Sequence, residues 1–423
     1  MLKRIVLLLG SVLAADGWAE EVMQTWPGLP PTLQITQALQ SQPKVLEAQA
    51  MFEAAQAHAN SLKAGPYEFN VRLGLHNRTV NTTPDDRYTE WEGALERSLR
   101  LPGKAQLDEK LGEEHINQAE LAVGDALHES GREFLKTWFE WMHQQDDALL
   151  WREQTTILSQ QSEIVAKRIK AGDAPPLERE AARAALARSK AQQIRAELAR
   201  DTASALLRGR YPQIVLPEAL VLPEPAIPEG TAESWKAATM QHNHELARAQ
   251  AAARASRISA SRMEANLRPD PAIGIRYSYE RGGEETVLGA YVTIPLPGQA
   301  RRADRNAAQA EASAASSQEA AVSARISQEA EAQFLKARYL YQVWQQAKVG
   351  TEAARRQAEG MEKAYQFGEA ALDETLMARR QSLEAQQAES MARLDALEAQ
   401  YRLKLDAHQL WPVDENEAKA HEH

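Results

Sequence analysis

A short motif occurs twice in the chain, and each copy separates a strand-like run from a very long stretch with helical composition. The first copy is Leu101-Pro102-Gly103-Lys104 and the second is Leu296-Pro297-Gly298-Gln299. Each copy ends a strand-like run, and no proline occurs for about 70 residues after it. A strand that ends at Pro-Gly and continues into an unbroken helix of this length constrains the fold more than any other feature of the sequence.

Each of the two long helices is predicted to run from a Pro-Gly motif to a second glycine. One runs from Pro102 to Gly172 and the other from Pro297 to Gly368, about 70 residues each. At 1.5 Å per residue each helix is roughly 100 Å long, which exceeds the size of a globular core. An Ala-Arg pair follows both glycines after ten residues, so the helices are predicted to reverse there in equivalent turns.

Each half of the chain also contains one predicted β-hairpin. Residues 69–76 and 273–279 alternate between apolar and polar side chains, which is typical of a strand whose two faces meet different media. Turn-forming residues follow at 81–86 and 281–284, and the return strands are predicted at 91–101 and 286–296. The return strands alternate less regularly than the outgoing ones.

The repeats and the flanking segments divide the chain into five predicted parts. Residues 1–19 have basic Lys3-Arg4, an apolar run and small residues near Ala19, which predicts a cleaved signal peptide and export. The first repeat spans 20–208, a Pro-rich linker spans 209–231, the second repeat spans 232–412 and a charged tail spans 413–423.

Composition and motif searches exclude several classes of function. A net charge of −10 without basic blocks disfavours binding to nucleic acid. The chain has no cysteine, and no nucleophile elbow, phosphate-binding loop or zinc-protease motif occurs, so we expect no enzyme activity and no cofactor. The histidine pairs His242/His244 and His421/His423 lack the closed ligand set of a metal site, and we expect no metal ligands.

The layout and several motifs resemble the outer membrane efflux protein family, the trimeric tunnel-type channels of Gram-negative bacteria. The resemblance covers nearly the whole chain after the signal peptide. It is carried by Ser41-Gln42-Pro43, by Leu101-Pro102-Gly103-Lys104, by Ile294-Pro295-Leu296-Pro297-Gly298 before Arg301-Arg302, and by Tyr365-x-x-Gly368. The Pro-Gly-Lys ending is most similar to the branch for cobalt, zinc and cadmium resistance.

This resemblance implies a mainly α fold with a small β part. Long antiparallel helices would form an α-barrel, and two β-hairpins per chain would contribute to a trimeric 12-stranded transmembrane β-barrel. Four strands cannot close a barrel; two copies give eight strands with a filled interior, whereas three copies leave a lumen. The implied location is the outer membrane, with a long periplasmic part.

The implied partners are two further copies of the chain, outer membrane lipid, a periplasmic adaptor (membrane fusion) protein and an inner-membrane proton-driven pump. The chain would be the passive exit duct for substrate, with heavy-metal cations as the expected cargo. A multidrug efflux channel, a periplasmic adaptor or coiled-coil scaffold, and a soluble metal-binding protein remain alternatives; the last leaves the repeat unexplained.

Three groups of residues are the predicted functional sites. The adaptor-docking tips are Gly172, Asp173, Ala174, Pro175, Gly368, Glu369, Ala370 and Ala371. The periplasmic gate is Glu178, Tyr365, Asp373 and Glu374, and the strand-helix hinges are Pro102, Gly103, Pro297 and Gly298. The gate departs from the family pattern at Ala370, where the family has an arginine, and at Met377, which replaces a carboxylate.

Overall fold

The structure is a computed structural model that describes residues 26–81, 86–217 and 221–411. The predicted signal peptide, the charged tail and the pair His421/His423 lie outside the described residues.

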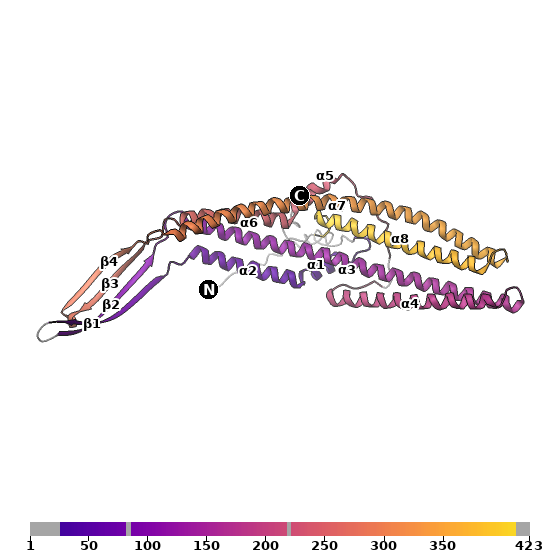
Figure 1. Cartoon of the computed structure of the whole chain (residues 1–423), viewed down its shortest axis with the longest axis horizontal. Coiled ribbons are helices and arrows are strands. Elements are labelled where there is room, and N and C mark those ends of the chain that lie inside the picture. The colour runs from indigo at the N-terminus through magenta and orange to yellow at the C-terminus, as the bar shows by residue number, and fades with distance from the viewer. Residues whose placement is uncertain (1–25, 82–85, 218–220, 412–423) are drawn as a thin grey trace, which may run out of the picture. The chain divides into compact units, whose positions relative to one another are not determined.

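The same order of elements occurs twice along the chain (Figure 1). The first half contains α1 (Thr32–Gln40), α2 (Pro43–Ala64), β1 (Phe69–Val80), β2 (Asp86–Ser98), α3 (Lys104–Ala171) and α4 (Leu177–Arg210). The second half contains α5 (Ala232–His242), α6 (His244–Ala265), β3 (Ala272–Glu280), the short 3-10 helix η2 (Arg281–Gly283), β4 (Glu285–Thr293), α7 (Gln299–Gln366) and α8 (Leu372–Asp406). The predicted mainly α fold with two hairpins is therefore confirmed.

Corresponding helices of the two halves have nearly the same length. Helices α2 and α6 have 22 residues each, and α3 and α7 have 68 residues each. The returning helices α4 and α8 have 34 and 35 residues. The bounds of α3 and α7 follow from the breakers that predicted them, because Pro-Gly precedes each helix and a glycine follows it.

The chain forms two compact units, and each unit takes segments from both halves of the sequence. The sheet unit consists of Glu47–Asp125 and Asn243–Ile326. The tip unit comprises Met1–Leu46, Ala126–His242 and Ser327–His423, of which the described residues are considered below.

The sheet unit contains one antiparallel sheet in the order β1-β2-β3-β4. Figure 1 shows the four strands side by side in chain order. Both predicted hairpins are present, and β2 also pairs with β3, with Leu95 opposite Ile275. Strand β2 ends at Ser98, three residues earlier than predicted, because the Leu99 and Leu101 amides donate to Pro271 and Asp270.

One face of this sheet is apolar and the other is polar. The pairing aligns Val71, Leu95, Ile275 and Ala290 in one row across the four strands. The adjacent row, on the opposite face, contains Arg72, Ala94, Arg276 and Gly289. Alternating apolar side chains of β1 are largely exposed: Phe69 62%, Val71 69%, Leu73 79% and Leu75 74%. Nothing in the described chain therefore covers the apolar face of β1.

The helices of the sheet unit are joined by small side chains and ion pairs. Ala251 and Ala255 of α6 are buried. Arg262 of α6 contacts Asp108 of α3 at 2.5 Å. Alanines allow helices to approach closely, and the ion pairs fix which turns face each other.

The tip unit has an aromatic core between its helices. The Phe134 ring lies 5.1 Å from that of Tyr211 and 5.9 Å from that of Trp411, and all three side chains are buried. Two helical hairpins continue from this core, one formed by α3 with α4 and the other by α7 with α8 (Figure 1). Among the described residues, no helix has the length and apolar character needed to cross a membrane.

Candidate functional site

The two helical hairpins of the tip unit reverse through the same backbone motif. Gly172 has φ 84° and Gly368 has φ 79°, a left-handed conformation that glycine adopts without strain. In the first tip the Gly172 amide donates to the Ile169 carbonyl, and the Asp173 amide donates to the Arg168 carbonyl. The same two hydrogen bonds recur in the second tip, so both long helices end in a Schellman motif.

The predicted docking residues are mostly exposed around these turns. Asp173, Pro175, Glu369 and Ala371 are exposed, whereas Ala174 and Ala370 are half-buried. Two apolar side chains that the sequence did not single out stand beside them. Leu177 and Phe367 are 78% and 81% exposed, so each tip presents a large apolar group to its surroundings.

Two predicted gate residues, Tyr365 of α7 and Glu178 of α4, are brought together by the structure. The Tyr365 hydroxyl donates a 2.7 Å hydrogen bond to Oε2 of Glu178. Tyr365 is only 1% exposed and packs in a cluster with Val165, Ala182 and Leu372. This contact joins the first helical hairpin to the second one close to both turns.

Arg168 of α3 strengthens the same junction. Its guanidinium lies 4.4 Å from the centroid of the Tyr365 ring, and its Nη1 donates to the Tyr365 carbonyl at 2.9 Å. Burial, followed by the hydrogen bond to Glu178 and the charge of that carboxylate, raises the pKa of Tyr365 to about 12. The phenol therefore stays protonated and remains a donor at neutral pH.

The other two predicted gate residues lie apart from this junction. Asp373 and Glu374 are exposed in the first turn of α8. Glu374 accepts a 3.3 Å hydrogen bond from the Ala371 amide, which caps its own helix. Within the described chain, no hydrogen bond or ion pair joins either carboxylate to Tyr365 or Glu178.

The first strand-helix hinge, in the sheet unit, contains a buried ion pair. Gly103 has φ 88°, and Lys104 begins α3 with a side chain that is 2% exposed. Its Nζ lies 2.9 Å from Oδ1 of Asp270 and donates to the Arg268 carbonyl at 2.7 Å. Asp270, two residues before β3, thereby holds the start of α3.

Asp270 is the centre of the hinge because three donors converge on it. The Leu101 amide donates to Oδ1 at 2.9 Å, and the Tyr67 hydroxyl donates to Oδ2 at 2.8 Å. Burial raises the pKa of this carboxyl, but hydrogen bonds from Lys104, Leu101 and Tyr67 outweigh burial and lower the pKa below 3.8. The carboxylate is therefore charged at neutral pH and bridges both hairpins of the sheet.

The second hinge is built differently. Gln299, which corresponds to Lys104 in the repeat, is exposed, and so are Pro297 and Gly298. Gly298 does not have the positive φ of Gly103. Arg301 ties the start of α7 by donating to the Asn266 carbonyl at 3.1 Å. Two similar motifs thus produce a buried hinge and an exposed hinge.

The sequence did not identify Asp270, Arg168 or the exposed residue Phe367 as site residues. One difference between the two hinge motifs could have indicated Asp270. Lys104 is charged and the equivalent Gln299 is neutral, so the two side chains need different partners. Arg168 had no such signal, because its equivalent Ala364 is an ordinary helical residue.

His242 packs against another histidine: its ring lies 5.7 Å from that of His408, which stacks at 5.2 Å on His128. Within residues 26–81, 86–217 and 221–411, no group of three or more His, Asp or Glu side chains could hold a metal ion.

One of the comparisons with known proteins matches a family over part of the chain. The family model for the outer membrane efflux protein matches residues 34–209. A comparison with curated proteins gave no match.

Solved structures share the fold over nearly the whole chain. The outer membrane channel CmeC of Campylobacter jejuni is 14% identical with a TM-score of 0.75, covering 99% of this chain and 97% of its own. The outer membrane protein VceC of Vibrio cholerae is 15% identical with a TM-score of 0.72, covering 90% of this chain and 96% of its own. A third structure is that of CusC, which was solved to follow its folding and transmembrane channel formation. It is 15% identical with a TM-score of 0.68, covering 94% of this chain and 95% of its own. The chain is thus similar to the outer membrane efflux proteins, in sequence over residues 34–209 and in fold over nearly its whole length.

Proposed function

We propose that three copies of this chain form a passive exit duct in the outer membrane, the last component of a tripartite efflux system. The observation that carries the proposal is the shared fold, which extends over 99% of this chain in the comparison with the CmeC channel. The family match over residues 34–209 supports it independently. Both the family and the fold are those of channel proteins rather than enzymes.

The sheet supports assembly with further copies. Strands β1 and β4 are its two edges, and their backbone groups need partners if the apolar face lies in lipid. Three copies would supply twelve strands, whose barrel leaves a lumen. The apolar row with Val71 and Ile275 would then face lipid, and the row with Arg72 and Arg276 would face the lumen.

The tips support docking to a periplasmic adaptor that connects the duct to an inner-membrane proton-driven pump. Gly172 and Gly368 provide compact turns, and the exposed side chains of Leu177 and Phe367 give each tip an apolar contact. Exposed apolar groups of this size are typical anchors for a partner protein. The pump would supply the energy, so the duct itself needs no cofactor.

The junction of Tyr365 with Glu178 supports a gate at the tips. The hydrogen bond joins the two helical hairpins of one chain, and separation of the hairpins requires that it break. Asp373 and Glu374 would contribute negative charge at the rim rather than to the junction itself. We therefore assign the described conformation of these hairpins to the closed state.

Heavy-metal cations are the proposed cargo. Exposed Asp373 and Glu374 would give three copies six carboxylates near the mouth, which favours cations. The resemblance of the Pro-Gly-Lys hinge to the cobalt, zinc and cadmium branch agrees with this. A duct for hydrophobic drugs is the alternative.

The test of function is a gene deletion combined with a bilayer measurement. Purified protein should form cation-conducting channels in planar lipid bilayers, and a protein without conductance would overturn the duct. A deletion strain should become sensitive to zinc, cobalt or cadmium ions. Sensitivity to hydrophobic drugs alone would support the duct but contradict heavy-metal cations as its cargo.

A further inference from the structure

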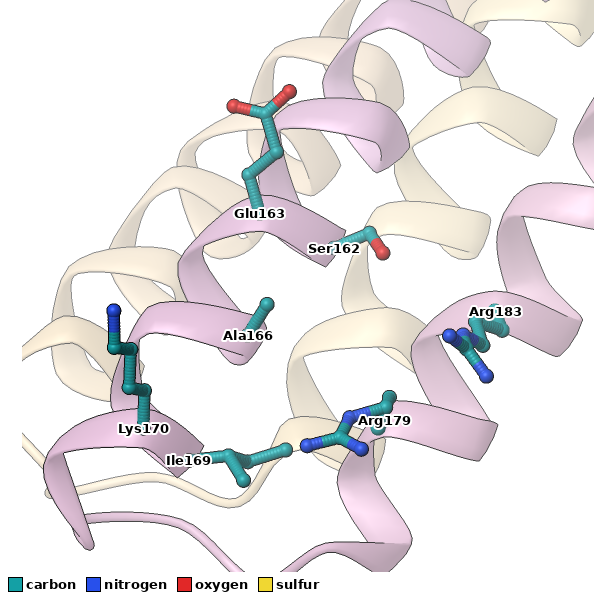
Figure 2. A pocket seen from close by; sticks show the side chains of 7 residues that line it. All are labelled: Ser162, Glu163, Ala166, Ile169, Lys170, Arg179 and Arg183. Carbon is teal, nitrogen blue, oxygen red and sulfur yellow. The ribbon is translucent and has the colours of Figure 1, made fainter.

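The first helical hairpin has a groove beside its tip (Figure 2). It lies between the last turns of α3 and the first turns of α4 and has a volume of about 630 Å³. Three cationic side chains line it, Lys170 from α3 and Arg179 and Arg183 from α4, together with one carboxylate, Glu163. Figure 2 shows both arginines extending from α4 towards α3, whereas the Glu163 carboxylate and the Lys170 amine point away from them.

The positive charge of this groove is only weakly compensated. Arg183 forms an ion pair with Glu180 of its own helix at 3.3 Å, but both side chains are 66% exposed. Such exposed pairs contribute little. In the part of the chain that the structure describes, no ion pair involves Lys170 or Arg179. The groove is therefore basic in a chain whose net charge is −10.

The second helical hairpin, which the structure describes in full, does not carry the same three cations. The tip glycines align the two hairpins, so the residues equivalent to Lys170, Arg179 and Arg183 are Gln366, Thr375 and Arg379. Two of the three cations are absent there. The third, Arg379, forms an ion pair with Glu362, which occupies the position of Ala166 in the first hairpin. The remaining arginine of the second hairpin is thus neutralised by a carboxylate, whereas the cations of the first hairpin are only weakly compensated.

The spacing of the arginines fits a helical partner. Arg179 and Arg183 are four residues apart on α4, so they lie on one side of the helix about 6 Å apart along its axis. A helix laid into the groove between α3 and α4 would match them with carboxylates placed one turn apart. A groove that lies between two helices suits a helical partner better than it suits a compact anion.

We propose that the basic groove of the first helical hairpin receives an acidic helix of the periplasmic adaptor, with Asp or Glu residues one helical turn apart. This inference rests on the proposed function, because it specifies the chemistry of adaptor docking. It also makes the two tips unequal: the acidic contact forms at the first tip and apolar contacts at Phe367 serve the second.

The experiment uses two synthetic helical hairpins as probes and the full-length protein in detergent. One probe carries Glu at i and i+4 on its exposed face, and the other carries Gln at the same positions. Isothermal titration calorimetry should show the Glu probe binding at least about tenfold more tightly than the Gln probe, with a difference that shrinks as salt rises. Equal binding of the two probes would overturn the inference.

Matched variants locate the binding. The variant Lys170→Ala/Arg179→Ala/Arg183→Ala should lose the preference for the Glu probe. The control Arg188→Ala/Lys190→Ala/Arg195→Ala removes three exposed cations of the same helix outside the groove and should keep it. If both variants lose this preference equally, the Glu probe is attracted by the overall charge of α4, and binding in the groove is contradicted. Charge reversal of the three groove residues to Glu should transfer the preference to a Lys probe.

Bilayer conductance separates this inference from the proposed function. A wild-type protein that forms no channels would overturn the duct, whatever the probes do. A protein that conducts but binds the Glu and Gln probes equally would overturn only the acidic partner. The groove variants should conduct like the wild type, which also shows that they fold and assemble.

Discussion

Tyr365 connects two helical hairpins through three separate parts of one residue. Its hydroxyl donates to Glu178, its ring stacks under the Arg168 guanidinium, and its carbonyl accepts from the same arginine. The ring and carbonyl contacts do not depend on the hydroxyl. The hydroxyl can therefore be removed while the packing stays, which isolates the proposed gate contact.

The substitution Tyr365→Phe should increase the open-to-closed ratio of the channel by about tenfold. A hydrogen bond to a charged group contributes on the order of 1.5 kcal/mol, and this one is broken only when the hairpins separate. Single-channel recording in planar bilayers measures the ratio. Tyr339→Phe, which removes a phenol from a side chain that is 61% exposed, is the control. An unchanged open probability would remove Tyr365 from the gate.

The pKa of Tyr365 predicts how this contact responds to pH. Because the pKa is raised from 10.0 to about 12, the hydrogen bond contributes stability below pH 10 and loses it as pH rises towards 12. An ultraviolet titration of wild type minus Tyr365→Phe should show a phenol that ionises well above 10. A difference curve centred at 10 would indicate that the hydroxyl is not bonded to Glu178.

The hinge pair of Lys104 and Asp270 gives a residue-scale prediction for stability. Lys104→Met leaves the Asp270 carboxylate without its buried cation, which should lower the free energy of unfolding by about 3 kcal/mol. The double variant Lys104→Met/Asp270→Asn should lose less, because no uncompensated charge remains. Thermal unfolding followed by circular dichroism measures both. Gln299→Met at the exposed equivalent position should be nearly neutral, and an equal loss there would contradict the buried pair.

At the scale of elements, the tips depend on the backbone conformation of single glycines. No atom lies within 4 Å of a β-carbon built on Gly172, so the positive φ rather than space limits substitution. The two Schellman motifs place α4 and α8 beside α3 and α7. A residue that cannot adopt positive φ changes the direction of the returning helix.

The variant Gly172→Glu should abolish efflux while the protein still assembles, because the strain is confined to the turn. Gly172→Asn should retain more efflux, since asparagine tolerates the left-handed conformation better. Gly350→Glu is the control within α7, where a β-carbon meets nothing within 4 Å. Efflux by Gly172→Glu at the wild-type level would argue against docking at this tip.

The bounds of the long helices could be predicted from sequence because local chemistry sets them. Pro-Gly and the tip glycines place α3 between residues 102 and 172, and the structure gives Lys104–Ala171. The repeat of these bounds supported the family resemblance, and that resemblance implied the fold class.

The contacts of the site could not be predicted in the same way. Lys104 and Asp270 are 166 residues apart in the chain, and Tyr365 and Glu178 are 187 apart. Resemblance named Tyr365 and Glu178 as gate residues, but neither spacing nor periodicity could indicate that they bond to each other. The different burial of the two hinges also depends on Asp270, a residue outside both motifs.

At the scale of the whole molecule, the apolar face of the sheet and its two edges predict an assembly. Purified protein should have the mass of three chains in detergent by light scattering, because three copies cover the edges of β1 and β4 and leave a lumen. A proline at Leu73 or Val287 should disturb this assembly more than a proline in the linker at residue 221. A stable monomer in detergent would contradict the proposed duct.

The equal length of α3 and α7 limits how such a chain can change in evolution. Both helices have 68 residues, and one inserted residue turns everything beyond it by about 100° around the helix axis. A single insertion in α3 would rotate the side of the helix that carries Arg168 away from Tyr365. Insertions of about seven or eleven residues, close to whole turns and made in both helices, would preserve the pairing. Helices α3 and α7 can therefore lengthen only in steps of about two or three turns, and both must lengthen together.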